Sequence, residues 1–220
     1  MKPVVIAIFA HPDDEAFGPG GTLAVLSKTH NVYIITVTGG EAGKNSLDSA
    51  EKDLSEIRKS ELLSSAKILG VKKVYFLGFK DGSLSNNLYH KIASKIEKKL
   101  KVLKPDIVIT FESGGVSGHI DHIATHFITT FVVKKLKKNL QLWYYFVPET
   151  HRALPSDYFI YFPPALEKSD ADKIIDTTDV WDIKKKAMLA HRSQAHDANR
   201  LLKHIEILPK NEYFLFYRSG

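Results

Sequence analysis

Histidine and aspartate gather at two places in this chain of 220 residues. The first cluster runs from His11 to Asp14, and the second, about a hundred residues later, runs from His119 to His122. Zinc binds imidazole and carboxylate groups, and a catalytic zinc site takes three protein ligands and keeps a fourth position for water. The metal lowers the pKa of that water towards about 7, so that a neighbouring carboxylate can take its proton. The two clusters together predict a metal site with hydrolytic chemistry.

The candidate ligands outnumber the three that such a site needs; they are His11, Asp14, His119, His122 and His126. His119 and His122 lie three residues apart at the expected start of a helix and so share one face. Asp13 and Asp14 are adjacent and point in different directions, so one can bind metal while the other faces the water. His126 lies one turn beyond His122, where packing against a sheet is the favoured interpretation and a fourth ligand is the alternative.

Acidic residues after a strand also have an ordinary explanation, because the first turn of a helix favours negative charge. This explanation accounts for Glu15 and for one of the two aspartates. It leaves His11 at the end of a strand unexplained, so we favour the metal site.

Alternating strands and helices must position these clusters. Apolar, β-branched runs predict strands, and helical periodicity predicts the segments between them. The pattern is typical of the α/β class: a three-layer Rossmann-like sandwich with a mostly parallel central sheet. In the strand order 3-2-1-4-5, strands one and four are neighbours where the order reverses, and ligands bind beyond their carboxyl ends. The expected strands are Val4–Ala10, Asn31–Thr38, Lys73–Leu77, Asp106–Phe111 and Gln141–Val147, and the expected helices are Gly20–Lys28, Ser49–Leu69, His90–Lys104 and His119–Lys138.

The regular pattern loosens after Pro148. A short strand over Tyr158–Phe162, a helix over Trp181–His191 and a final strand over Glu212–Tyr217 are expected there. We expect one domain over residues 1–220, with a Rossmann-like core over 1–147 and a smaller C-terminal elaboration over 148–220. This elaboration is expected to shape one end of the pocket.

The composition narrows the class of protein. Hydrophobic residues make up 44% and charged residues 25%, which excludes a disordered or collagen-like chain. The sequence has no cysteine, which excludes disulfides, thiolate metal sites and cysteine nucleophiles. Since no apolar run approaches the roughly 20 residues of a membrane span, and no signal peptide is recognisable, we expect a cytoplasmic protein without a membrane span.

The net charge of +6 has a simple origin. Lysines interleaved with apolar residues are typical of the solvated faces of amphipathic helices. Nucleic-acid binding would require basic residues mixed with exposed aromatics or a known module, so no nucleic-acid partner is expected. The lysine-rich stretches are Lys95–Lys104, Lys134–Lys138 and Lys184–Lys186.

The sequence resembles the LmbE/PIG-L family of zinc-dependent N-acetylglucosaminyl deacetylases. The resemblance rests on Ala10-His-Pro-Asp-Asp-Glu15 and on His119-x-x-His122, and it extends to about Gln194. Weaker matches support it: Thr38–Glu41, Arg58-x-x-Glu61, Gly78-x-x-Asp81-Gly82-x-Leu84 and His191–Gln194. One departure is Ile120, which stands where many members have proline.

The resemblance implies a role for each matched residue. The zinc ligands would be His11, Asp14 and His122. Asp13 would be the general base, His119 would stabilise the oxyanion as an imidazolium, and Asp121 would orient His119. The residues that match sugar-binding positions are Arg58, Glu41 and Asp81.

Three matched residues also have ordinary interpretations. Arg58 and Glu61 are three residues apart and could form a surface ion pair worth about 0.2–0.5 kcal/mol. Asp81 precedes a glycine, which by itself indicates a turn. His191 could reach the site or cap the helix in whose last turn it lies.

The function that follows is removal of the acetyl group from an N-acetylated amino sugar, such as an N-acetylglucosaminide, through a metal-activated water. The alternatives are a zinc hydrolase of another amide or ester, and a catalytically silent module that binds a sugar or a nucleotide on the same fold. Iron(II) or another divalent ion would fit the same ligands as Zn²⁺. The resemblance also implies a homo-oligomer, a trimer or hexamer. The same motifs fit sugars that carry different attached groups.

Overall fold

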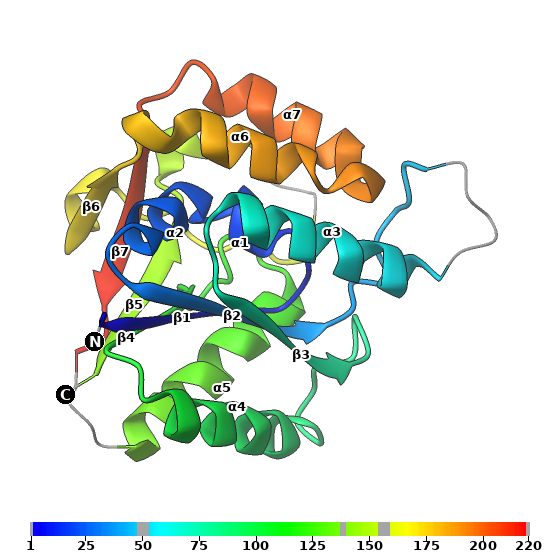
Figure 1. The fold of residues 1–220 in the computed structure, drawn as a ribbon, viewed down its shortest axis with the longest axis vertical. Coiled ribbons are helices and arrows are strands. Elements are labelled where there is room, and N and C mark those ends of the chain that lie inside the picture. Colours follow the sequence, from blue (N-terminus) through cyan, green and yellow to red (C-terminus); the bar gives the residue numbers. More distant parts are fainter. Residues whose placement is uncertain (1, 48–52, 137–139, 154–158, 219–220) are drawn as a thin grey trace.

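The computed structural model describes residues 2–47, 53–136, 140–153 and 159–218. Its centre is a seven-stranded sheet in the order β3-β2-β1-β4-β5-β7-β6, with helices packed on both faces (Figure 1). This confirms the predicted α/β class and the order of the first five strands. The strands are β1 Val4–Phe9, β2 Asn31–Thr38, β3 Lys73–Phe79, β4 Ile107–Phe111, β5 Gln141–Phe146, β6 Lys173–Asp176 and β7 Asn211–Phe216.

The first strand shows why the core has two layers. Successive side chains of a strand point to opposite faces of the sheet, and a strand covered on both faces must therefore be apolar throughout. From Val5 to Phe9 every side chain of β1 is fully buried. Val5, Ala7 and Phe9 enter one hydrophobic cluster, whereas Ile6 and Ile8 enter the other.

Helices α4 and α5 cover one face of the sheet, and the remaining α-helices cover the other (Figure 1). In α4 the predicted apolar spacing is confirmed, since Ile92, Ile96 and Leu100 are buried. The predicted start of α3 at Ser49 lies outside the described residues. The helices are α1 Asp14–Phe17, α2 Gly20–Ser27, α3 Leu54–Ile68, α4 Tyr89–Leu103, α5 Ile120–Leu136, α6 Trp181–Leu189 and α7 Ala195–Ile205.

The chain after β5 extends the same sheet. Strand β7 pairs antiparallel with β5, and β6 pairs antiparallel with β7. The predicted helix at Trp181 and the final strand are confirmed as α6 and β7. The strand predicted over Tyr158–Phe162 is wrong for residues 159–162, which form no strand; Tyr158 lies outside the described residues. The sequence pattern missed β6 and α7, because β6 alternates without a buried run and α7 begins directly after a short 3-10 turn.

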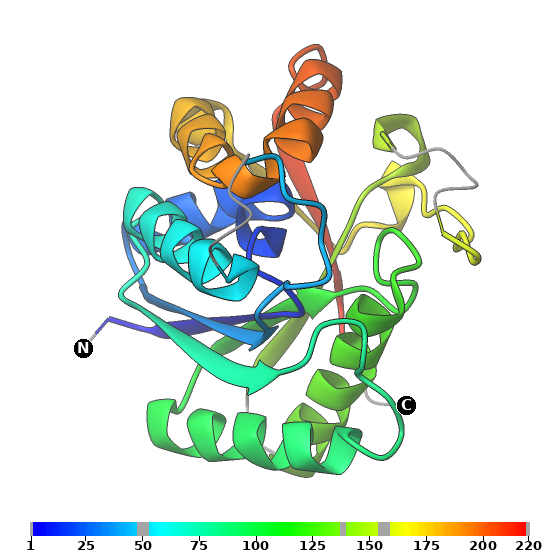
Figure 2. The ribbon, with the colours of Figure 1, turned by 90° about the vertical axis from the view of Figure 1, so that its right-hand side faces the viewer.

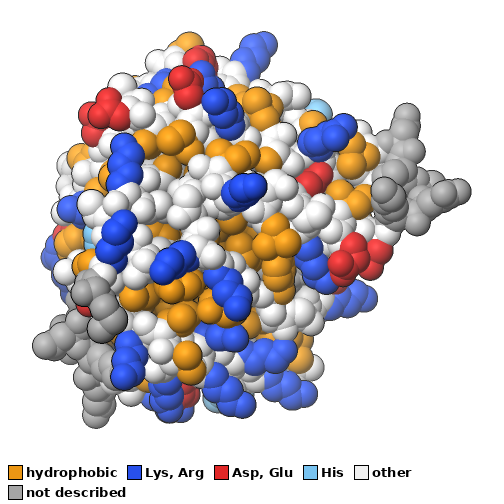
Figure 3. Space-filling view, in the orientation of Figure 1, with side chains coloured by type: hydrophobic (Ala, Val, Ile, Leu, Met, Phe, Trp, Pro, Cys, Tyr) orange, Lys and Arg blue, Asp and Glu red, His pale blue; other side chains and the backbone are white. Residues whose placement is uncertain are grey.

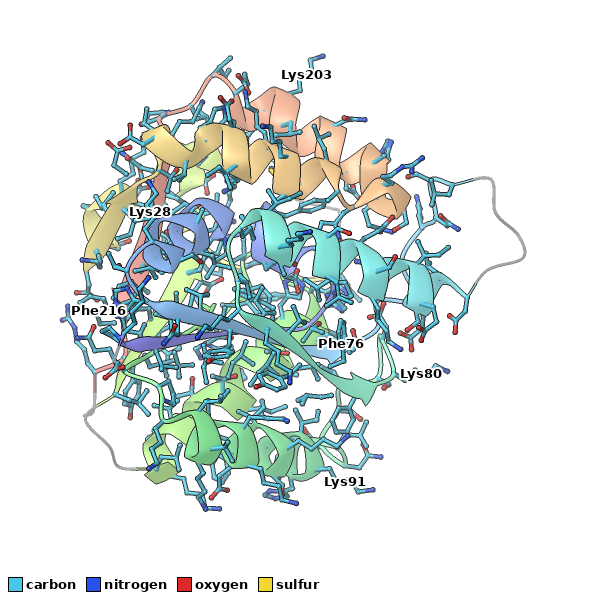
Figure 4. All side chains as sticks on the ribbon, viewed as in Figure 1. Lys28, Phe76, Lys80, Lys91, Lys203 and Phe216 are labelled. Carbon is cyan, nitrogen blue, oxygen red and sulfur yellow. The ribbon has the colours of Figure 1, made fainter. Side chains whose placement is uncertain are left out.

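The lysines of the helices lie mostly in solvent, as expected. Lys95, Lys98 and Lys101 of α4 are exposed. Figure 3 shows basic side chains spread over the surface, and in Figure 4 Lys91 and Lys203 point away from the protein. Lys184 is the exception and corrects the prediction, because it is only 5% exposed and is paired with Glu212 at 2.6 Å.

The α-helices of the protein are short or carry charged side chains. Within the described ranges, none is both long enough and apolar enough to cross a bilayer.

Candidate metal centre

The two His/Asp clusters meet at the carboxyl edge of the sheet. Strands β1 and β4 are parallel neighbours, with Ala7 opposite Ile109, so the segments that follow them emerge side by side. Both segments line one cavity of about 520 Å³. The topology expected from the sequence therefore brings residues about a hundred positions apart into one site.

Three side chains converge in this cavity, and Asp14 turns Oδ2 towards His11 and Oδ1 towards His122. His11 Nδ1 lies 3.1 Å from His122 Nε2, and the Asp14 carboxylate lies 3.6 Å from His11 Nδ1 and 3.2 Å from His122 Nε2. Ligands at about 2.0–2.1 Å from a tetrahedral metal stand about 3.3 Å from one another. The observed separations bracket this value, so the three residues fit a tetrahedral divalent metal. One ring nitrogen of His119 lies within 4.8 Å of one ring nitrogen each of His11 and His122, which keeps His119 near enough to act on the same centre.

Neighbouring groups fix the orientation of both imidazoles. His122 Nδ1 bonds to the carbonyl oxygen of Gly115 at 3.0 Å, and its ring stacks on Phe111 at 4.1 Å between centroids. The Nδ1–H must donate to that carbonyl, so Nε2 keeps its lone pair for the centre. His11 has the reverse arrangement, because its Nε2 lies 2.9 Å from Asp81 Oδ1 and 3.5 Å from Asp121 Oδ2. Such carboxylate–histidine pairs are usual behind metal-binding imidazoles.

The carboxylates give the centre a negative character that suits a cation. Burial works against charge on His11, but the Asp121, Asp14 and Asp81 carboxylates raise its pKa well above the usual value. Burial opposes charge on Asp81 as well, yet hydrogen bonding to His11 lowers the pKa of Asp81 to about 2. A bound divalent cation would take the place of the extra positive charge that the site otherwise holds on His11.

Asp13 adopts a backbone conformation that side-chain contacts must hold in place. Its φ is 118°, in the region that favours glycine, and such a residue costs on the order of 1–3 kcal/mol. The Glu15 carboxylate accepts its backbone N–H at 3.0 Å, and Arg58 donates to its Oδ2 at 2.7 Å. Burial raises the pKa of Asp13 to about 6, against the lowering effect of the Arg58 charge.

Arg58 is buried and points at the aspartate instead of at solvent. Its guanidinium donates to the Gly40 carbonyl at 2.6 Å, to the Pro12 carbonyl at 2.5 Å and to Asp13. Gly40 has φ 69° and a Cβ there would lie 2.5 Å from the guanidinium, so glycine allows this close approach. The surface ion pair with Glu61 is wrong as an interpretation, because Glu61 is buried and accepts from the backbone N–H and the hydroxyl of Ser193.

His119 lies immediately before α5, with its ring 4.7 Å from that of His11. The backbone N–H of Asp121 donates to His119 Nδ1 at 3.1 Å, so the neutral ring carries its proton on Nε2. Burial and the charges of His11 and His122 lower the pKa of His119 to about 4. These contacts support a neutral N–H donor in place of the imidazolium that the resemblance implies. They also show that Asp121 touches His119 through its amide.

The carboxylate of Asp121 has other partners. It accepts from the backbone N–H groups of Gly82 at 2.8 Å and Leu84 at 3.2 Å, in the loop after β3. Asp81 of the same loop lines the cavity and accepts from the Ala42 N–H at 3.0 Å. Glu41 is not among the lining residues that the structure describes; its carboxylate instead accepts the Asp81 N–H at 3.1 Å.

The sequence allows two interpretations each for His126 and His191. His126 is buried and bonds to the Phe111 carbonyl at 2.8 Å, which confirms packing against the sheet. His191 is fully buried, and its Nε2 lies 2.7 Å from Glu15 Oε1. His191 therefore acts on the site indirectly, because the Glu15 carboxylate that it contacts also accepts the backbone N–H of Asp13. Sequence reasoning missed Glu15 in this role, because an acidic residue in a first helical turn already has an explanation.

The sequence of the chain matches a known protein family. Residues 6–133 match the family model described as PIG-L, GlcNAc-PI de-N-acetylase. A probable N-acetyl-alpha-D-glucosaminyl L-malate deacetylase 2 of Bacillus cereus is 30% identical over 200 residues, 88% of this chain and 84% of that protein. A 1D-myo-inositol 2-acetamido-2-deoxy-alpha-D-glucopyranoside deacetylase of a Mycobacterium species is 27% identical, over 88% of this chain and 75% of that protein.

Solved structures share the fold. An N,N'-diacetylchitobiose deacetylase from Pyrococcus horikoshii has a TM-score of 0.74 at 24% identity, over 98% of this chain and 84% of its own. A 4-carboxy-2-hydroxymuconate hydratase from Pseudomonas putida has a TM-score of 0.73 at 15% identity, over 99% and 97%. Since two different reactions occur on one architecture, the fold alone does not decide the chemistry. The family match does cover more than half of the sequence, and on that ground the chain belongs to the PIG-L family of GlcNAc-PI de-N-acetylases.

Proposed function

We propose that this protein is a metal-dependent N-deacetylase that hydrolyses the acetamide of an N-acetylglucosamine-type sugar. The observation that carries the proposal is the convergence of His11 Nδ1, Asp14 and His122 Nε2 at tetrahedral separations, with a second aspartate beside them. The names of the relatives support the amino-sugar substrate. They do not favour hydrolysis of an unrelated amide or ester, and the full set of ionisable groups argues against a silent binding module.

His11, Asp14 and His122 would hold the metal, and we propose zinc, since imidazole and carboxylate ligands suit it. Iron(II) or another divalent ion would fit the same donors. When bound, the metal supplies a Lewis acid for the acetamide carbonyl and lowers the pKa of a water at its open position.

Asp13 is proposed as the general base. Arg58 holds its Oδ2, which leaves Oδ1 for the proton of the attacking water. After attack, the same carboxyl group can return that proton to the leaving amine. The raised pKa of Asp13, about 6, suits a group that must both take and give a proton near neutral pH.

His119 is proposed as the donor that stabilises the tetrahedral oxyanion. Its Nε2–H is free to donate because the Asp121 amide occupies Nδ1. Asp121 is therefore proposed as a positioning residue for His119, through its amide, and for His11, through its carboxylate.

The contact of Arg58 supports a role in positioning Asp13. The contact of Glu41 supports a role in positioning the loop after β3, and that of Asp81 a role in positioning His11. Sugar binding by these three residues stays a prediction. A single domain over residues 1–220, a cytoplasmic location and a homo-oligomer also stay predictions from the sequence.

The test is metal analysis followed by a deacetylation screen. Protein is stripped with a chelator, reloaded with zinc or iron(II), and incubated with a series of N-acetylglucosaminides while free amine is measured. We expect about one bound ion per chain and amine release that depends on it. A protein that binds metal but releases no amine from any N-acetylglucosaminide would contradict the proposal.

A further inference from the structure

The cavity does not end at the metal centre. Because β7 pairs antiparallel with β5, the first residues of β7 lie beside the carboxyl end of β5, with Tyr213 opposite Phe146. The cavity follows this edge past β4 and β5 to β7. In Figure 2 the helix α7 and the chain around residues 149–151 rise on two sides above this edge.

We call this extension the apolar arm. Leu201 and Ile205 lie one turn apart on α7, so they share a face, and both are half-buried and line the cavity. Aromatic and aliphatic side chains from the strands and from α6 complete it. The arm consists of Tyr145, Val147, Trp181, Leu201, Ile205 and Tyr213.

The positive side chains around the arm are bound to the protein itself. Lys184 donates to Glu212 at 2.6 Å and to the Gly18 carbonyl at 2.7 Å. Lys210 donates to three backbone carbonyls near the end of α7. An anionic ligand would have to break these bonds before either lysine could meet it.

The two arginines of this region are held in the same way. Arg200 pairs with Asp197 at 2.9 Å, and Arg152 donates through its two terminal nitrogens to the Pro163 and Pro164 carbonyls at 2.9 and 3.1 Å, while its Nε is buried without a hydrogen-bond partner among the described residues. Lys44 is exposed and lines the same cavity; its backbone carbonyl accepts from the Gln194 amide directly before α7, whereas Leu201 and Ile205 lie later in that helix. Most of the positive charge that the structure describes around the arm is therefore already paired within the protein, which favours an uncharged ligand there.

We propose that the arm binds the group attached to the sugar, and that this group is an uncharged alkyl or aromatic substituent. The inference rests on the proposed deacetylase function, since it places the sugar at the metal end of the cavity. A cavity of about 520 Å³ has room for both parts, because pockets for small ligands span about 300–1,000 Å³. The substrate would thus differ from the malate- and inositol-bearing sugars named for the relatives.

Burial of an alkyl group in the arm should raise the binding affinity by a measurable factor. Each methylene removed from water strengthens binding by roughly three- to four-fold. A hexyl substituent that enters the arm should therefore bind at least ten-fold more tightly than the same sugar without it.

Binding is measured with product amines, which cannot be turned over. Hexyl glucosaminide, glucosamine and glucosaminyl malate are titrated into the wild-type protein by calorimetry. We expect the hexyl compound to bind at least ten-fold more tightly than the other two. Equal affinities, or a preference for the malate compound, would overturn the inference.

Two variants locate the binding. Leu201→Ser should reduce the preference for the hexyl compound at least five-fold, whereas Ile207→Ser, at a side chain 84% exposed near the end of α7, should leave it unchanged. If Leu201→Ser does not fold, Ile205→Ser replaces it. A hexyl preference that the arm variant retains in full would place the ligand elsewhere and refute the arm.

A deacetylation assay on the N-acetylated forms separates this inference from the proposed function. Amine release without a hexyl preference would refute the arm and leave the deacetylase. A hexyl preference in binding, without amine release from any compound, would refute the deacetylase and leave the arm as a binding site.

Discussion

The two ends of the cavity are built in different ways. At the metal end, Asp13 and His122 are held by hydrogen bonds and His11 by a close contact with the Asp81 carboxylate, and Asp13 keeps a costly backbone conformation because of its contacts. In the apolar arm, Leu201 and Ile205 meet the cavity through non-directional contacts. The metal end therefore holds individual atoms in fixed positions, whereas the apolar arm presents a surface without directional contacts.

This difference implies different responses to change. A hydrogen-bonded reaction centre fails when one donor is lost, since the remaining groups were positioned for it. Apolar burial scales with area, so loss of a methyl group has a graded effect.

His122→Ala should abolish activity. The change removes one of the three converging donors, and the bound ion should fall to a small fraction of one per chain, measured by elemental analysis. His126→Gln, one turn along α5, is the matched control and should keep its metal because His126 bonds to a backbone carbonyl. Full metal content in His122→Ala would exclude His122 as a ligand.

Asp13→Asn should lower kcat by about 10²–10⁴-fold, the usual contribution of a general base. The amide keeps the shape of the side chain but cannot take a proton. Metal content should stay at the wild-type level, because Asp13 is not one of the converging donors. Wild-type turnover in this variant would assign the proton transfer to another group.

His191→Gln should destabilise the protein by about 1–3 kcal/mol, the cost of losing a charged buried hydrogen bond. Burial opposes charge on His191, but Glu15 raises its pKa. A histidine with a raised folded pKa adds stability that is complete below its unfolded pKa of about 6.5 and is lost as pH rises through the folded value. The difference from wild type should therefore be larger at pH 6 than at pH 9, in urea unfolding.

The matched control for that measurement is His90→Gln, at an exposed histidine, which should change stability by less than about 0.5 kcal/mol at both pH values. A pH-independent loss in His191→Gln would show that His191 acts by packing and not through its charge.

Ile205→Val should weaken binding of hexyl glucosaminide by about two- to four-fold, the effect of one methylene. Metal content should not change. Calorimetry measures the affinity, and Ile207→Val is the control. A loss of metal in Ile205→Val would contradict the separation of the two ends.

Most of the fold could be predicted because local patterns and global topology agree. Fully apolar runs such as Val5–Phe9 indicate strands buried on both faces, and Ile92, Ile96 and Leu100 mark the inner face of a helix. Beyond β5 the agreement is partial, because α6 and β7 were predicted but β6 and α7 were not. Residues 159–162 contain aromatic residues but form no strand, and Lys184 lies in a lysine run but is buried against Glu212.

The sequence by itself determined which groups are proposed to react, because the residue types at 11, 13, 14, 119 and 122 limit the chemistry, and strand order brings distant segments to one edge. The tertiary structure decided which groups support them. Arg58 and Glu15 hold Asp13, and the amide of Asp121 fixes the tautomer of His119. Such contacts depend on orientations of side chains from separate elements, which periodicity and spacing along a chain do not record.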